Sequence, residues 1–161
     1  MKKLLIASVL MLSTYLMQAQ ELPQTVIRDL NGKQLAFNET FVKGKITMYS
    51  FWATWCIPCK QEINNIKSKL EGWQKEVDFN YITISLDDAR NTTQVKTYTK
   101  AKGWNFPVYL DANSDLKRSL NFQDIPFTII VDKEGKIVYQ HTGYEEGGEN
   151  ELFQKIKELA K

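Results

Sequence analysis

Cysteine and histidine are scarce in this sequence, with two cysteines and one histidine among 161 residues. Two cysteines cannot form a disulfide-rich scaffold, and one histidine cannot supply a His-based metal cage. The 21 Lys and Arg against 19 Asp and Glu give a net charge of +2, which excludes a basic footprint for nucleic acid or acidic membranes. At 43% hydrophobic and 12% aromatic residues, the chain is predicted to form one compact domain. Most of its chemistry must therefore lie in a few residues.

The N-terminus has the pattern of a secretory signal peptide. Two lysines precede the mostly apolar run Leu4–Leu16, and the small residue Ala19 offers a cleavage position. The run is 13 residues long, whereas a membrane span requires roughly 20 apolar residues. We therefore expect residues 1–19 to be removed and residues 20–161 to form a single soluble domain in the periplasm or otherwise outside the cytoplasm. Paired cysteines can form a disulfide in those oxidising surroundings.

The pattern of the mature chain predicts an α/β domain. Runs of high β propensity predict strands at Ile46–Phe51 and within Val77–Leu86, and Asn31-Gly32 predicts a hairpin turn before them. Apolar residues at helical spacing predict a helix from about Pro58. Further predicted elements are a helix from a capping box of Asn91 and Gln94 to Lys102, a strand Phe106–Leu110, a helix Asn113–Leu120, a hairpin of Phe127–Val131 with Ile137–Gln140, and a helix carrying Leu152–Ala160. This alternation indicates a mixed central sheet flanked by helices.

Both cysteines lie between the first buried strand and the helix that follows it. Cys56 and Cys59 are two residues apart, and Pro58 fits the first helical turn, where a missing N–H is tolerated. A helix N-terminus stabilises a thiolate, which is the reactive form of cysteine. A stapling disulfide around so short a loop stabilises little, and an all-thiolate zinc site requires four cysteines. The setting therefore favours a redox-active pair.

The segment Trp55–Lys60 resembles the active site of the thioredoxin superfamily, and the longer run Phe51–Cys59 resembles its TlpA/ResA branch of exported proteins. Other stretches that resemble this branch are Asn31–Lys33, Phe106–Val108 followed by Asp111, and Pro126–Thr128 leading into Asp132–Val138. The resemblance covers residues 22–161. It implies a thioredoxin fold with an N-terminal β-hairpin and a central βα insertion near Asp87–Leu110.

The resemblance also implies residues that contact the substrate. Pro126 stands where the family has a cis-proline that faces the cysteine pair and keeps metals from the sulfurs. The backbone of Ile125, just before it, is implied to pair with an extended substrate chain. Trp55 is expected to shape the same surface. For Trp52, a role beside the active site and packing in the core are equally open interpretations.

Glu62 is a candidate proton acceptor for the second cysteine. It follows Cys59 by three residues, so on a helix the two lie on the same side, one turn apart. A glutamate at this spacing is a feature of the ResA-like branch, and a carboxylate there can take the proton of Cys59. The alternative is a solvated helix residue. The strand position where thioredoxins carry a buried acid is Ser50 here, so any proton relay must run through Glu62 or water.

The resemblance implies an exported thiol-disulfide oxidoreductase that reduces disulfides in other proteins. Cys56 would attack the target disulfide, and Cys59 would then release the reduced target. No flavin, nicotinamide or metal motif occurs, so the Cys56–Cys59 pair itself is expected to be the redox centre, with no cofactor. Implied partners are a disulfide-containing protein, with apocytochrome c as one family example, and a membrane thiol that donates electrons. We expect the protein to act as a monomer and not to bind nucleic acid.

Three other functions are compatible with a cysteine pair. A thiol oxidase would run the same chemistry in reverse, and only the reduction potential distinguishes the two directions. A Cu(I) chaperone would bind the metal through Cys56, Cys59 and His141, although such proteins have a longer Cys–Cys spacing. An exposed strand-end histidine is the simpler interpretation of His141. A peroxidase would require a Thr-x-x-Cys site, which Thr54-Trp55-Cys56 does not provide.

Overall fold

A computed structural model describes residues 20–161 of the chain, and the predicted signal peptide lies outside the described residues. This part of the chain folds around one eight-stranded mixed sheet in the order β1-β8-β7-β4-β5-β6-β2-β3. The strands are β1 (Gln20–Glu21), β2 (Val26–Asp29), β3 (Gln34–Ala36), β4 (Ile46–Trp52), β5 (Phe79–Ser85), β6 (Val108–Leu110), β7 (Phe127–Val131) and β8 (Lys136–Thr142). The predicted fold class is therefore confirmed.

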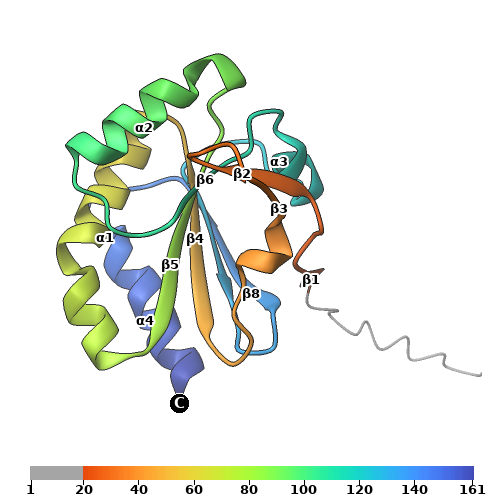
Figure 1. Cartoon of the computed structure of the whole chain (residues 1–161). Coiled ribbons are helices and arrows are strands. Elements are labelled where there is room, and N and C mark those ends of the chain that lie inside the picture. The colour runs from red at the N-terminus through yellow and green to blue at the C-terminus, as the bar shows by residue number, and fades with distance from the viewer. Residues whose placement is uncertain (1–19) are drawn as a thin grey trace, which may run out of the picture.

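Helices cover both faces of the sheet (Figure 1). The helical elements are η1 (Phe37–Thr40), α1 (Ile57–Glu76), η2 (Ala89–Asn91), α2 (Thr92–Ala101), α3 (Asp115–Ser119) and α4 (Gly148–Ala160). The long helices α1, α2 and α4 pack on one face, and α3 and η1 lie on the other. No helix within residues 20–161 is long and apolar enough to cross a membrane.

The central strand β4 is buried at all seven positions. It pairs in parallel with β5 and antiparallel with β7, so both of its edges are covered. Its side chains alternate between two cores: Met48 and Trp52 lie in the layer beneath α1 and α4, whereas Tyr49 and Phe51 lie in the opposite layer. This burial on both faces explains the nearly continuous apolar run in the sequence. The chain leaves β4 at the edge of the sheet where β5 also ends.

The N-terminal hairpin forms as predicted and extends the sheet. β2 pairs with β3 through the turn at Asn31-Gly32, and β2 also pairs antiparallel with β6. The predicted insertion contains η2, α2 and β6, and β6 is shorter than the predicted strand Phe106–Leu110. Pro107 has no N–H to donate, and its carbonyl oxygen accepts the N–H of Thr83 at the entrance to β6.

The predicted capping box at α2 is wrong. Asn91 precedes α2 with near-helical backbone angles (φ −95°, ψ 2°) and makes no side-chain capping hydrogen bond. The helical segment already begins at η2, where the side chain of Asp88 accepts the N–H of Arg90. Asp88 therefore supplies the cap that the sequence pattern assigned to Asn91.

Candidate active site

The two cysteines form a disulfide at the start of α1. Their Cα atoms are 5.4 Å apart, and Cys56 is the N-cap of the helix, with its sulfur accepting the N–H of Cys59 at 3.3 Å. Cys56 is 5% exposed, whereas Cys59 is fully buried. In the reduced protein, the same N–H and the positive end of the helix dipole favour a thiolate on Cys56. The first cysteine is therefore suited to attack, and the second to an internal reaction.

A buried carboxylate, Asp87, fixes the turn between β4 and α1. It accepts the backbone N–H of Thr54 at 2.8 Å, the Thr54 hydroxyl at 2.6 Å and the Ser85 hydroxyl at 2.7 Å. Lys60 donates to the carbonyl oxygen of Thr54 from the other side at 2.8 Å. No local motif in the sequence points to Asp87. Its position after β5 could have placed it near the cysteines, because parallel strands β4 and β5 end at the same edge of the sheet and the cysteines follow β4.

Ile125 and Pro126 lie against the cysteine pair. The Ile125–Pro126 peptide bond is cis, and the carbonyl oxygen of Ile125 is 3.9 Å from the sulfur of Cys56. Trp55 is 68% exposed and Ile57 is 65% exposed, so large apolar groups stand in solvent beside Cys56. Of the predicted contact residues, Ile125 lies at the Cys56 sulfur, Pro126 follows it through the cis bond, and Trp55 precedes Cys56 in the chain.

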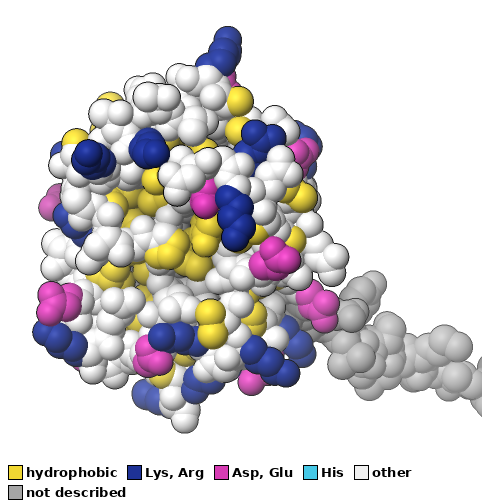
Figure 2. Space-filling view, viewed as in Figure 1, with side chains coloured by type: hydrophobic (Ala, Val, Ile, Leu, Met, Phe, Trp, Pro, Cys, Tyr) yellow, Lys and Arg dark blue, Asp and Glu magenta, His cyan; other side chains and the backbone are white. Residues whose placement is uncertain are grey.

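Two hollows on the surface differ in their relation to this site. The larger, about 680 Å³, lies over the first half of β5, beside α1, and its lining contains neither cysteine. Figure 2 shows the hydrophobic side chains that gather in the middle of this face. The smaller, about 230 Å³, also lacks both cysteines, but its lining includes Trp55, which precedes Cys56, and Ile125, whose carbonyl oxygen is 3.9 Å from the Cys56 sulfur. The other lining residues are Leu86, Ser114, Lys117, Gln123 and Asp124. The smaller hollow is the one placed to receive a side chain of a molecule that reacts at Cys56.

Glu62 is buried on α1 and is not a solvated helix residue. Its side chain is 2% exposed, and Oε2 has no hydrogen-bond partner. Burial raises the pKa of Glu62 to about 8, and the negative charge of Glu149 adds to this effect, while the Thr128 hydroxyl partly offsets it. Such a carboxyl takes up a proton far more readily than an exposed glutamate.

The hydroxyls of Thr128, Ser50 and Tyr81 form a buried chain of hydrogen bonds in the core. The Thr128 and Ser50 hydroxyl oxygens are 3.1 Å apart, and the Tyr81 hydroxyl donates to that of Ser50 at 3.2 Å. Burial raises the pKa of Tyr81 well above its ordinary value, so this phenol stays neutral. Ser50 therefore joins a neutral hydroxyl chain at the position where thioredoxins carry an acid, and Glu62 is the carboxyl beside that chain.

Trp52 is a core residue, and His141 is a strand residue of β8. Trp52 is fully buried and packs on Trp104 and Tyr98, with ring centroids 4.8 and 5.6 Å away, so the core-packing interpretation is correct. His141 lies in β8 opposite Thr128 and is half-buried. Within residues 20–161, no three His, Cys, Asp or Glu side chains come together in an arrangement suited to a metal ion.

A mixed sheet with helices on both faces and a two-cysteine pair at the start of its first long helix define a thioredoxin-like redox protein. The sequence matches the Redoxin family over residues 17–156. The chain belongs to the Redoxin family, and the predicted TlpA/ResA-like membership of the thioredoxin superfamily is confirmed.

Individual relatives agree with this assignment. Thiol-disulfide oxidoreductase ResA from Bacillus thuringiensis (strain Al Hakam) is 32% identical over 127 residues, which are 77% of this chain and 69% of that protein. An uncharacterized thioredoxin-like protein from Porphyromonas gingivalis is 42% identical with a TM-score of 0.77, covering 86% of this chain and 91% of that one. A putative protein disulfide isomerase from Bacteroides thetaiotaomicron is 29% identical with a TM-score of 0.72, covering 88% and 89%. The predicted enzyme class, thiol-disulfide oxidoreductase, is confirmed.

Proposed function

We propose that the protein is an exported thiol-disulfide oxidoreductase that reduces disulfides in other proteins. The observation that carries the proposal is the unequal burial of the pair: Cys56 keeps 5% exposure beside exposed Trp55, whereas Cys59 is fully buried. A target disulfide has access to one sulfur only. The relatives named thiol-disulfide oxidoreductase support the same chemistry.

The proposed reaction starts from the reduced pair and proceeds in two exchanges. The Cys56 thiolate attacks one sulfur of the target disulfide, which forms a mixed disulfide and releases the other target sulfur as a thiolate. Cys59 then loses its proton and attacks the Cys56 sulfur. This step forms the Cys56–Cys59 disulfide seen in the structure and releases the second target sulfur. Two electrons pass from the pair to the target, so the pair is itself the redox centre and no cofactor takes part.

Glu62 is the proposed acceptor of the Cys59 proton. It lies one helical turn beyond Cys59, and its pKa of about 8 is close to that of an ordinary thiol, about 8.5. Proton transfer between groups of similar pKa is nearly balanced in free energy, whereas an exposed glutamate would be a much weaker base. Burial thus gives Glu62 the basicity that the second exchange needs.

The proposed substrate surface is the small hollow with its exposed rim. Trp55 and Ile125 would contact the chain on either side of the target cysteine, and the backbone before Pro126 would pair with it as an added strand. Lys117 and Asp124 lie at the same hollow and would bind polar groups of the substrate.

The predicted signal peptide and the resemblance to exported proteins support a location outside the cytoplasm. There, a membrane thiol donor would return electrons to the pair, and a disulfide-containing protein such as apocytochrome c would receive them. We propose a monomer, because one chain carries both cysteines and the whole substrate surface.

The reduction potential of the Cys56–Cys59 pair tests the direction of the reaction. We expect a value near that of thioredoxin, about −270 mV, measured by equilibration in a defined dithiol buffer. Such a pair reduces protein disulfides and must be supplied with electrons. A value near that of DsbA, about −120 mV, would instead establish a thiol oxidase and reverse the proposed direction.

A further inference from the structure

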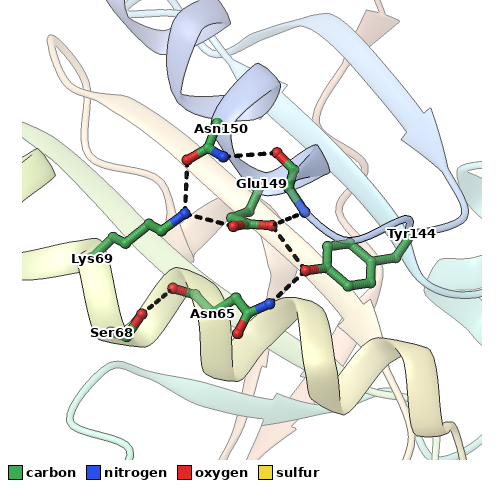
Figure 3. A network of polar contacts seen from close by, with 7 residues as sticks. Asn65, Ser68, Lys69, Tyr144, Glu149 and Asn150 are labelled. Carbon is green, nitrogen blue, oxygen red and sulfur yellow. Dashed lines mark hydrogen bonds and ion pairs between the residues drawn. The ribbon is translucent and has the colours of Figure 1, made fainter.

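An ion pair between half-exposed Lys69 and buried Glu149 lies at the junction of α1 and α4 (Figure 3). Glu149, in the first turn of α4, is 3% exposed. Its Oε1 accepts Lys69 Nζ at 2.6 Å, and its Oε2 accepts the Tyr144 hydroxyl at 2.8 Å and the Gly147 N–H at 3.2 Å. These donors hold Glu149 in its charged form: burial alone would raise its pKa, but hydrogen bonds led by that from Lys69 bring it below the ordinary value.

The same cluster reaches along α1 toward Glu62. The Asn65 amide donates to the Tyr144 hydroxyl at 2.6 Å, and Figure 3 shows Asn65 and Lys69 pointing from α1 toward Tyr144 and Glu149. Glu62 precedes Asn65 by three positions and Lys69 by seven, so the three share one face of α1. The charge of Glu149, held in place by these hydrogen bonds, acts on the Glu62 carboxyl, whose Oε2 has no hydrogen-bond partner.

We propose that Glu149 is a positioning residue for the thiol chemistry: its fixed charge, balanced by Lys69, sets how readily Glu62 takes the proton of Cys59. This inference rests on the proposed function. Neither Glu149 nor Lys69 touches a sulfur. They act through Glu62, and the opposite signs of their charges give opposite effects.

The other groups around Glu62 are neutral. Tyr81 faces it from β5 and stays protonated, because burial raises its pKa. Thr128 faces it from β7, and Ser50 of β4 reaches it only through Thr128. Burial also raises the pKa of Tyr144, so this phenol is uncharged. Within the described part of the chain, Glu149 is thus the charged group that raises the pKa of Glu62, and Lys69 is its ion-pair partner.

The test is the titration of Glu62 in two oxidised variants, Glu149→Gln and Lys69→Met. The carboxyl is followed by ¹³C NMR on protein labelled at the glutamate carboxyl carbon, with Glu62→Gln assigning the signal. We expect Glu149→Gln to lower the Glu62 pKa and Lys69→Met to raise it, each by about one unit. For Glu149→Gln, this shift raises the ionised fraction of Glu62 at pH 7 about fivefold.

A purely structural role predicts a different result. Loosening the junction of α1 and α4 would admit water in both variants and lower the Glu62 pKa in both. Shifts of the same sign, or no shifts, would overturn the proposal. Tyr144→Phe is the matched control, because it removes a hydrogen bond to Glu149 without changing any charge, and we expect it to move the Glu62 pKa least. If either charge variant fails to fold, Lys69→Arg and Glu149→Asp keep the charges and should preserve the wild-type pKa.

A kinetic measurement separates this inference from the proposed function. The rate at which Cys59 resolves a mixed disulfide on Cys56 is measured against pH, and Glu149→Gln should shift the profile to lower pH. The NMR titration requires no turnover, so it remains valid if the direction of the redox reaction is reversed. Opposite NMR shifts with an unmoved rate profile would overturn the link between the ion pair and the thiol reaction.

Discussion

At the scale of single residues, one carboxylate determines how the chain enters α1. Asp87 accepts three hydrogen bonds in a site that is 2% exposed, and two of the donors belong to Thr54, two residues before Cys56. Removing the acceptor leaves buried donors without partners, which costs more than an ordinary hydrogen bond contributes. Asp87 therefore supports both the stability of the domain and the geometry of its cysteine pair.

We expect Asp87→Ala to lower the free energy of unfolding by about 2–4 kcal/mol. The measurement is urea unfolding of the oxidised protein at a fixed pH. Asp78→Ala is the control, because the Asp78 side chain is 83% exposed and pairs only with Lys45, so its loss should be below about 1 kcal/mol. Equal losses in the two variants would show that the Asp87 hydrogen bonds are not important to the fold.

The residues predicted from sequence were those with a local signal. Cys56, Cys59 and Glu62 follow from spacing along one helix, and Pro126 follows from the family resemblance. Asp87 and Glu149 were missed because their partners are distant in sequence: Thr54 is 33 positions from Asp87, and Lys69 is 80 positions from Glu149. Whether a charged side chain is buried depends on such long-range packing, which residue spacing does not contain.

At the scale of elements, the β7–β8 hairpin depends on a glycine with a left-handed backbone. Gly135 has φ +91°, and a Cβ there would lie 3.1 Å from Cε1 of Phe41. The turn is also closed by Asp132, whose side chain accepts the N–H groups of Glu134 and Lys136 at 3.0 and 2.9 Å. Glycine is required here for both its backbone angle and the space that it leaves.

Gly32, in the N-terminal hairpin, provides a matched comparison. It has φ +87°, and nothing lies within 4 Å of where its Cβ would be. We expect Gly32→Ala to cost about 1 kcal/mol of unfolding free energy for the backbone angle alone, and Gly135→Ala to cost more because the Phe41 ring must move. Thermal and urea unfolding of both variants measure the difference. A cost for Gly135→Ala no greater than that for Gly32→Ala would mean that the ring yields without penalty.

Elements with a strong periodic pattern were predicted well, and their ends less well. The strand over Ile46–Phe51 and the helix from Pro58 match β4 and α1 within one residue at their starts. The capping box at Asn91 failed because a 3₁₀ turn precedes α2 and places the cap at Asp88. Such a turn has no apolar periodicity, so the sequence pattern alone does not reveal it.

At the scale of the whole molecule, the sequence pattern predicted a mixed sheet but not the order of its strands. The pairing of β2 with β6, which joins the N-terminal hairpin to the central insertion, follows from no local signal. The hairpin had a local turn signal at Asn31-Gly32, whereas only the family resemblance suggested where the insertion lies. The order matters for function, because it leaves β4 between β5 and β7 and so places Glu62, Thr128 and Tyr81 in one buried cluster.

That cluster makes the stability of the oxidised protein depend on pH. The pKa of Glu62 rises from 4.5 to about 8 on folding, so between these values the folded state binds more protons than the unfolded state. The free energy of unfolding must then fall with rising pH. The contribution of the neutral carboxyl is fully present below pH 4.5 and is lost as pH rises through about 8.

Glu62→Gln removes this dependence, because glutamine keeps the shape of the carboxyl and does not titrate. We expect the variant to gain stability relative to the wild type as pH rises from about 5 to about 8, by at most about 1.4 kcal/mol per pH unit. Urea unfolding of both oxidised proteins at several pH values measures this difference, in which the titration of groups common to both cancels. Parallel stability curves would show that Glu62 keeps an ordinary pKa, and the proton acceptor of Cys59 would then have to be water. A wild-type curve that falls relative to that of the variant toward pH 8 would show that folding raises the pKa of Glu62, which makes its ionised form a stronger acceptor for the Cys59 proton.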